Sequence, residues 1–165
     1  MSSKNAVIWV MALLLSACGY HLRGALDLPE NMKNIYVEGG SSPLVEQFKL
    51  VMKTSSGQLS DSRKGAGIII KIYNETFDRR VTSLSSRGKS NEFELSYRLD
   101  YEFVDAKDAL LMDRQTVDIK RDYYNDQTAV IAKDTEETGI RNEMYQQAVS
   151  AIVNRARVVL GAGAK

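Results

Sequence analysis

Cysteine and histidine are almost missing from this 165-residue sequence, and their scarcity excludes several kinds of site. The single cysteine, Cys18, cannot form an internal disulfide bond. Together with the single histidine, His21, it supplies too few ligands for a zinc site of the usual kind. A Ser-His-Asp arrangement would have to use His21, and the sequence has no Gly-x-Ser-x-Gly elbow. It also lacks Gly-x-Gly-x-x-Gly and Walker motifs. We therefore expect a protein that is not an enzyme and that has no metal or cofactor.

An excess of charge of one sign is missing too. The chain has 22 lysine and arginine residues against 21 aspartate and glutamate residues, for a formal net charge of +1. A protein that binds nucleic acid generally presents a cationic surface. A nearly neutral chain therefore predicts no nucleic-acid partner.

The apolar run near the N-terminus, residues 6–15, is too short to span a bilayer comfortably, which takes about 20 residues. It follows Lys4 and leads into Leu15-Ser16-Ala17-Cys18, which resembles the lipobox of bacterial lipoproteins. We predict that residues 1–17 are a lipoprotein signal peptide. The thiol of Cys18 would then receive a diacylglyceryl group before cleavage. The alternative is an ordinary signal peptide with an incidental cysteine.

A mature chain that begins at Cys18 is long enough for one domain with one core. We expect a lipid-anchored tether over residues 18–32, a single domain over 33–160 and a frayed tail over 161–165. Gly19, in the position after the lipidated cysteine, fits sorting to the outer membrane. The expected location is the periplasmic side of that membrane.

The first half of the domain shows a strand, a helix and another strand. Residues 34–38 predict a short strand. Ser42 and Pro43 predict the N-cap and first residue of a helix that ends near Gly57. Residues 68–73 predict a β-branched strand that continues to about residue 84, although the buried face becomes ambiguous beyond Asn74.

The second half begins with the clearest pattern in the sequence. Apolar and polar residues alternate strictly over residues 92–103, which predicts a strand with one buried and one wet face. Residues 110–124 predict another strand with a bulge near residues 113–115. A final helix, capped by Asn125 or Asp126, has an apolar stripe, and it either bends or properly begins at Gly139.

These elements predict an α+β fold in the order βαβββα. We expect a two-layer structure, with a four-stranded, mixed but mostly antiparallel sheet and two helices on one face.

Three groups of charged residues are candidate sites, each with a structural alternative. The Arg87-Gly88-Lys89 turn presents two cations suited to phosphate, or is a solvated turn. Lys133 is a second candidate cation, or a surface lysine paired with a nearby acid. An acid pair among Asp105, Asp108 and Asp113 is less favoured than a solvated hairpin.

Several segments, taken in order, resemble the LptE family of lipopolysaccharide-assembly lipoproteins. They are the Cys18-Gly19-Tyr20-His21-Leu22-Arg23 start, the Arg87-Gly88 turn before a glutamate-rich strand, Arg121-Asp122-Tyr123-Tyr124-Asn125, Ala132-Lys133-Asp134 and Glu143-Met144-Tyr145. The set extends over nearly the whole mature chain.

The resemblance implies a function that composition does not show. Members of the family bind lipopolysaccharide and sit as a plug in LptD, a large outer-membrane β-barrel, which they help to assemble. It also implies that Arg87 and Lys133 are lipopolysaccharide-binding residues, and we add Lys89 because it is close to Arg87. Two other hypotheses stay open, which are a scaffold lipoprotein without a glycolipid site and an envelope enzyme.

Overall fold

The computed structural model describes residues 28–84, 90–124 and 130–162. The elements in chain order are a short 3₁₀ helix η1 (Glu30–Met32), β1 (Asn34–Glu38), α2 (Ser42–Thr54), β2 (Gln58–Leu59), β3 (Ile68–Leu84), β4 (Ser90–Val104), β5 (Leu110–Tyr124) and α3 (Val130–Ala162). The predicted α+β class is confirmed.

One mixed sheet has the strand order β2-β1-β3-β4-β5. β1 is parallel to both β2 and β3, as expected for strands joined through a helix, whereas β3, β4 and β5 are antiparallel. The sheet has five strands rather than the predicted four. The additional strand, β2, consists of two residues, which is too short to show any periodicity.

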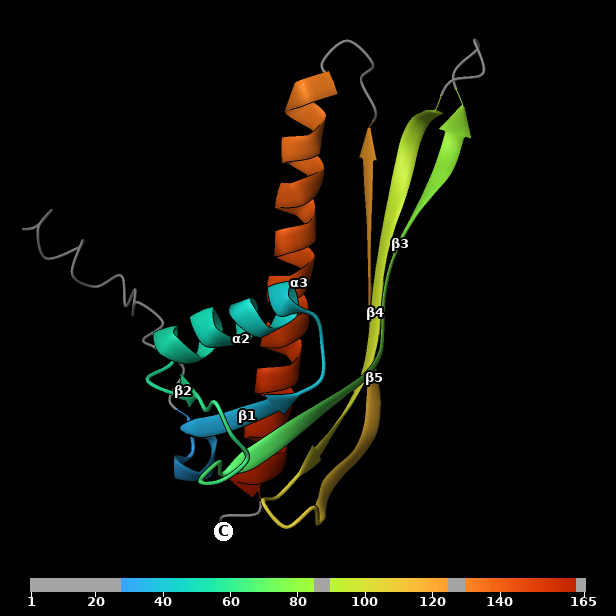
Figure 1. Cartoon of the computed structure of the whole chain (residues 1–165). Coiled ribbons are helices and arrows are strands. Elements are labelled where there is room, and N and C mark those ends of the chain that lie inside the picture. The colour runs from blue at the N-terminus through green and yellow to red at the C-terminus, as the bar shows by residue number, and fades with distance from the viewer. Residues whose placement is uncertain (1–27, 85–89, 125–129, 163–165) are drawn as a thin grey trace, which may run out of the picture.

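Both helices cover the same face of the sheet, and the core lies between these two layers (Figure 1). The alternation predicted for β4 is confirmed, because every apolar residue of its inner face is buried: Phe93, Leu95, Tyr97, Leu99, Tyr101 and Phe103. The apolar stripe of α3 is also buried at Met144, Ala148, Ile152 and Ala156.

α2 differs from its prediction at both ends. Its N-cap is Ser41 rather than Ser42, since the Ser41 carbonyl accepts a hydrogen bond from the Val45 N–H at 3.0 Å. The Ser41 side chain does not cap the helix but donates, together with the Ser41 backbone N–H, to the Glu75 carboxylate on β3. At the other end Ser56 has a left-handed φ of 57°, and the Gly57 N–H donates to the Met52 carbonyl at 2.9 Å. A Cβ on Gly57 would lie 2.5 Å from Met52 Cε, so close packing explains this glycine.

Two bulges reset the strand faces. Asn74 has a φ of 49°, and the β3–β4 register shifts between Tyr73 and Thr76, which explains why the pattern of β3 becomes ambiguous there. On β5, Gln115 pairs with Tyr101 and Met112 with Phe103, so two residues of β5 face one of β4. The predicted bulge near residues 113–115 is confirmed.

Both predicted domain boundaries shift by a few residues. Leu28 and Met32, which fall in the predicted tether, are buried in the core, and Met32 is the last residue of η1. Their segment contains too few residues to show a periodic pattern, so its sequence does not distinguish it from a linker. At the other boundary, α3 continues to Ala162, inside the predicted tail. The packed domain therefore begins before residue 33, and α3 ends two residues after residue 160.

α3 is one helix from Val130 to Ala162, and Gly139 lies within it (Figure 1). The helix neither begins nor is interrupted at this glycine. The proposed caps, Asn125 and Asp126, lie outside the described residues.

Candidate functional site

β3, β4 and β5 extend beyond the part of the sheet near α2, and α3 runs along this extension (Figure 1). Leu84 pairs with Ser90 and Glu92 pairs with Tyr124, so β3 and β5 finish, and β4 begins, at one end of the sheet. The first turn of α3 lies at the same end. We call this the distal end.

The described residues that flank the predicted cations in sequence meet at the distal end. Arg87 and Lys89 fall between Leu84 and Ser90 in sequence but lie outside the described residues. Lys133 is in the first turn of α3, and its side chain lies outside the description. Cys18 is outside it as well. The topology therefore brings the segments that flank these cations to one end, without describing the cations themselves.

Large apolar side chains are exposed near the distal end. Val81 and Leu84 on β3 and Tyr124 on β5 are all well exposed to solvent. Val81 and Leu84 also line a shallow hollow with the two residues between them. The distal ends of β3 and β5 therefore offer exposed apolar surface.

A charged cluster that the sequence analysis missed is centred on Glu137 of α3. Arg79 of β3 donates to Glu137 Oε2 at 2.9 Å, and the Tyr123 hydroxyl of β5 donates to the same oxygen at 2.6 Å. Arg141, one turn further along α3, donates to Glu137 Oε1 from Nε at 3.1 Å and from Nη2 at 2.8 Å. The cluster fastens the first half of α3 to two strands.

Aromatic rings support the two arginines of this cluster. The Arg79 guanidinium lies 4.4 Å from the centre of the Phe93 ring, and that of Arg141 lies 4.1 Å from the centre of the Phe77 ring. Phe93 stacks on Tyr123 with ring centres 5.5 Å apart. Such contacts restrict the positions of both guanidinium groups.

The environment shifts the pKa values of Glu137 and Tyr123. Burial disfavours the charged form of Glu137, but hydrogen bonds from Tyr123, Arg141 and Arg79 outweigh burial and lower the pKa of Glu137. Burial and the bond to Glu137 raise the pKa of Tyr123 to about 12. The cluster at neutral pH therefore holds two cations, one carboxylate and a neutral phenol.

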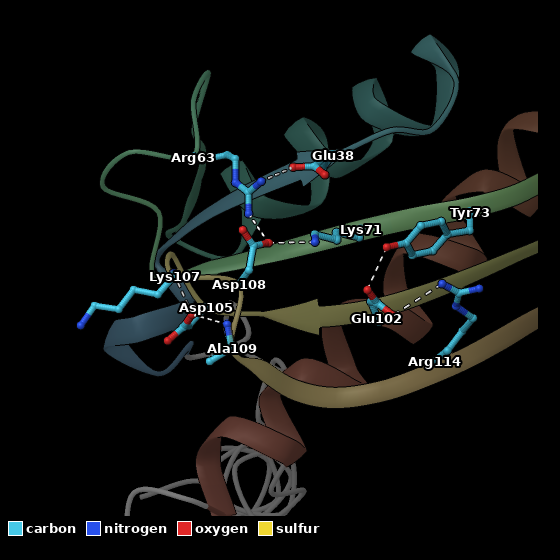
Figure 2. Close-up of polar contacts among 10 residues, drawn as sticks. All are labelled: Glu38, Arg63, Lys71, Tyr73, Glu102, Asp105, Lys107, Asp108, Ala109 and Arg114. Carbon is cyan, nitrogen blue, oxygen red and sulfur yellow. Dashed lines mark hydrogen bonds and ion pairs between the residues drawn. The ribbon is translucent and has the colours of Figure 1, made fainter.

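A second charged cluster lies at the opposite end of the sheet, on its other face (Figure 2). Asp108, in the β4–β5 hairpin, pairs with Arg63 and with Lys71 of β3, and Arg63 also pairs with Glu38 of β1. Hydrogen bonds from Lys71 and Arg63 lower the pKa of Asp108. The charges of this second cluster balance, because two cations face two carboxylates. The cluster ties the β4–β5 hairpin to the loop that precedes β3.

The acid pair considered for this hairpin is not supported by the arrangement of its carboxylates. Asp105 accepts hydrogen bonds from the backbone N–H groups of Lys107 and Ala109, which fixes the turn (Figure 2). Asp108 is held by its two cations. Among the described residues, no group of three or more histidine, cysteine or acidic side chains is placed to hold a metal ion.

Within residues 28–84, 90–124 and 130–162, no helix is both long enough and apolar enough to cross a membrane.

Comparison with known proteins gives concordant results. The family model LptE, described as lipopolysaccharide-assembly, matches residues 32–156. The LPS-assembly lipoprotein LptE of Pectobacterium atrosepticum is 22% identical over 159 residues, which is 94% of this chain and 85% of that protein. The protein of the same name in Photorhabdus laumondii is 21% identical over 155 residues, 93% of this chain and 84% of that protein.

Solved structures share the fold. The solution NMR structure of an uncharacterized lipoprotein B from Nitrosomonas europaea has a TM-score of 0.71 and 26% identity, and covers 88% of this chain and 94% of that one. The crystal structure of the rare lipoprotein B from Shewanella oneidensis has a TM-score of 0.63 and 17% identity, and covers 79% of this chain and 97% of that one. The family model matches residues 32–156, which is well over half of this chain, so the chain belongs to the LptE family.

Proposed function

We propose that this chain is an outer-membrane lipoprotein that binds lipopolysaccharide and helps to deliver it to the outer leaflet. In this proposal it acts as the plug and assembly partner of an LptD-type β-barrel, on the periplasmic side, and is anchored through lipid on Cys18. The observation that carries the proposal is the match of the lipopolysaccharide-assembly family model to residues 32–156. The relatives named LPS-assembly lipoprotein LptE support it.

The distal end supports the binding part of the proposal. Lipopolysaccharide presents phosphate groups beside acyl chains, so its site needs cations next to apolar surface. Val81, Leu84 and Tyr124 supply exposed apolar surface. The proposed cations are Arg87 and Lys133, with Lys89 as an additional one. Arginine and lysine bind phosphate through charge-assisted hydrogen bonds.

The double variant Arg87→Asp with Lys133→Asp tests the site. A charge-assisted contact contributes roughly 1.5–3 kcal/mol, so loss of both is expected to weaken lipopolysaccharide binding by at least about 100-fold. Binding is measured with purified protein whose circular dichroism matches that of the wild type. Lys64→Asp with Lys107→Asp is the matched control, because both of these lysines are exposed, and they lie in the pre-β3 loop and the β4–β5 hairpin, away from the distal end. If the Arg87→Asp with Lys133→Asp variant and this control bind lipopolysaccharide with equal affinity, the assignment of Arg87 and Lys133 is contradicted.

Purification from membranes tests the partnership. We expect the full-length lipoprotein to co-purify with a large outer-membrane β-barrel that mass spectrometry identifies as LptD. The complex should survive high salt, because a protein enclosed by a barrel is held by an extensive surface. Recovery of a different envelope-assembly complex, together with no binding of lipopolysaccharide, would favour the scaffold hypothesis.

A further inference from the structure

The two oxygens of Glu137 receive four hydrogen bonds from three side chains. Oε1 accepts two from Arg141, and Oε2 accepts one each from Arg79 and Tyr123. These donors come from β3, β5 and α3 and converge on one carboxylate group, that of Glu137. A phosphate monoester has three terminal oxygens and a charge of about −1.5 to −2 at pH 7, so it could satisfy the same donors with more acceptor capacity.

The charge of this cluster is not balanced. Two guanidinium groups, of Arg79 and Arg141, face one carboxylate, and the neutral Tyr123 hydroxyl adds no charge. In the cluster around Asp108, by contrast, two cations face two carboxylates. Among the side chains that the structure describes, one positive charge beside Glu137 has no carboxylate partner, which favours a more strongly charged anion in its place.

The arginines are accessible from solvent, whereas the carboxylate lies beneath them. The side chains of Arg79 and Arg141 are 48% and 39% exposed, and that of Glu137 is 16% exposed. The rings of Phe93 and Phe77 lie against the two guanidinium groups, 4.4 and 4.1 Å from them, and restrict their positions. An incoming anion therefore meets donors whose positions are already restricted, which reduces the entropy lost on binding.

We propose that Arg79, Arg141 and Tyr123 form a binding site for a phosphate group, and that the Glu137 carboxylate fills this site in the present structure. The ligand class is a phosphorylated glycolipid, an assignment that rests on the proposed function. The exposed side chain of Val81 lies on the same strand as Arg79, two residues nearer the distal end, and offers apolar contact for an acyl chain. Phosphate binding displaces Glu137 and frees the first half of α3 from β3 and β5.

The Glu137→Gln variant of the full chain tests the site, with inorganic phosphate as the probe. NMR spectra of the arginine Nε–Hε groups report phosphate at Arg79 and Arg141. We expect Glu137→Gln to bind phosphate about tenfold more tightly than the wild type, because a competing charge is removed. Glu136→Gln, a change at the adjacent exposed glutamate, should leave the affinity unchanged. Adding Arg141→Gln to Glu137→Gln should abolish the gain.

Equal phosphate affinity in Glu137→Gln and the wild type would overturn the proposal, as would a gain that survives Arg141→Gln. If Glu137→Gln does not fold, the wild type decides the question. Phosphate-dependent shifts at both arginines that exceed those caused by chloride at equal ionic strength support the site, and their absence overturns it.

A second arm identifies the source of the phosphate. Diphosphoryl lipid A in detergent micelles should shift the same two signals in Glu137→Gln, and dephosphorylated lipid A should not. Shifts with inorganic phosphate alone would overturn the glycolipid assignment. Arg87 and Lys133 are intact in every variant, so a failure here is distinct from a failure of the proposed distal site.

Discussion

Replacing Gly67 by alanine is expected to lower the free energy of unfolding by about 3 kcal/mol, the upper end of the usual cost of overpacking. A Cβ at this position would lie 2.1 Å from the Asn31 carbonyl oxygen and 2.9 Å from its carbonyl carbon. Both are backbone atoms, so no change of rotamer relieves the clash. The Gly67 N–H also donates to the Asn34 carbonyl at 2.8 Å, which fixes the entry into β3. Relief therefore requires η1 to move away from the sheet, and this movement exposes Met32.

Gly139→Ala is the matched control for this substitution. Gly139 lies within α3 and is exposed, and a Cβ there would meet no atom within 4 Å. The same change should therefore stabilise the protein by about 1 kcal/mol through helix propensity. Urea denaturation followed by circular dichroism measures both variants. A Gly67→Ala protein as stable as the wild type would show that η1 does not approach β3 as closely as this structure has it.

The elements that could be predicted were those in which the local pattern and the tertiary contacts agree. Alternation in β4 predicted both the strand and its buried face, because the sheet is covered on one side only. The bulge in β5 could be predicted because the apolar residues before it and those after it occupy different alternate positions along the strand. β2 and η1 leave no such signal, because each has too few residues for a period and depends on neighbours distant in sequence.

The site was predictable only in part, for a similar reason. Glu137 and Arg141 are four residues apart, a spacing that indicates a local ion pair on a helix. Arg79 is 58 residues away from Glu137, and Tyr123 is 14 residues away across the β5–α3 connection. The strand register brings these side chains together, and the register depends on the bulges. From the sequence, the acids in this part of the helix were expected only as local partners of Lys133.

The packing of α3 differs along its length, which bears on both proposals. From Met144 onward its inner face is buried, whereas Ile140 is only partly buried and Glu137 is held by polar contacts. Apolar burial contributes roughly 25 cal/mol per Å², so the second half of the helix carries most of the docking energy. The first half, beside the distal end, is the part that a ligand can displace at low cost in stability.

Replacing Cys18 by alanine is expected to abolish lipid attachment and to remove the protein from the outer membrane. A single acyl chain binds a bilayer only marginally, at about 10⁴ M⁻¹, and stable anchoring needs additional chains or a second signal. We expect three acyl chains on the wild-type cysteine, enough for stable anchoring. Metabolic labelling with palmitate, followed by separation of inner and outer membranes, measures both consequences.

Gly19→Asp is the matched control for Cys18→Ala, because it changes the neighbouring residue and leaves the thiol in place. This variant should still carry lipid and remain in the membrane fraction, but in the inner membrane, since the residue after the cysteine governs sorting. The two variants therefore separate anchoring from destination. Intact-mass measurement of the wild-type protein that shows cleavage elsewhere, or an unmodified Cys18, would contradict the anchor.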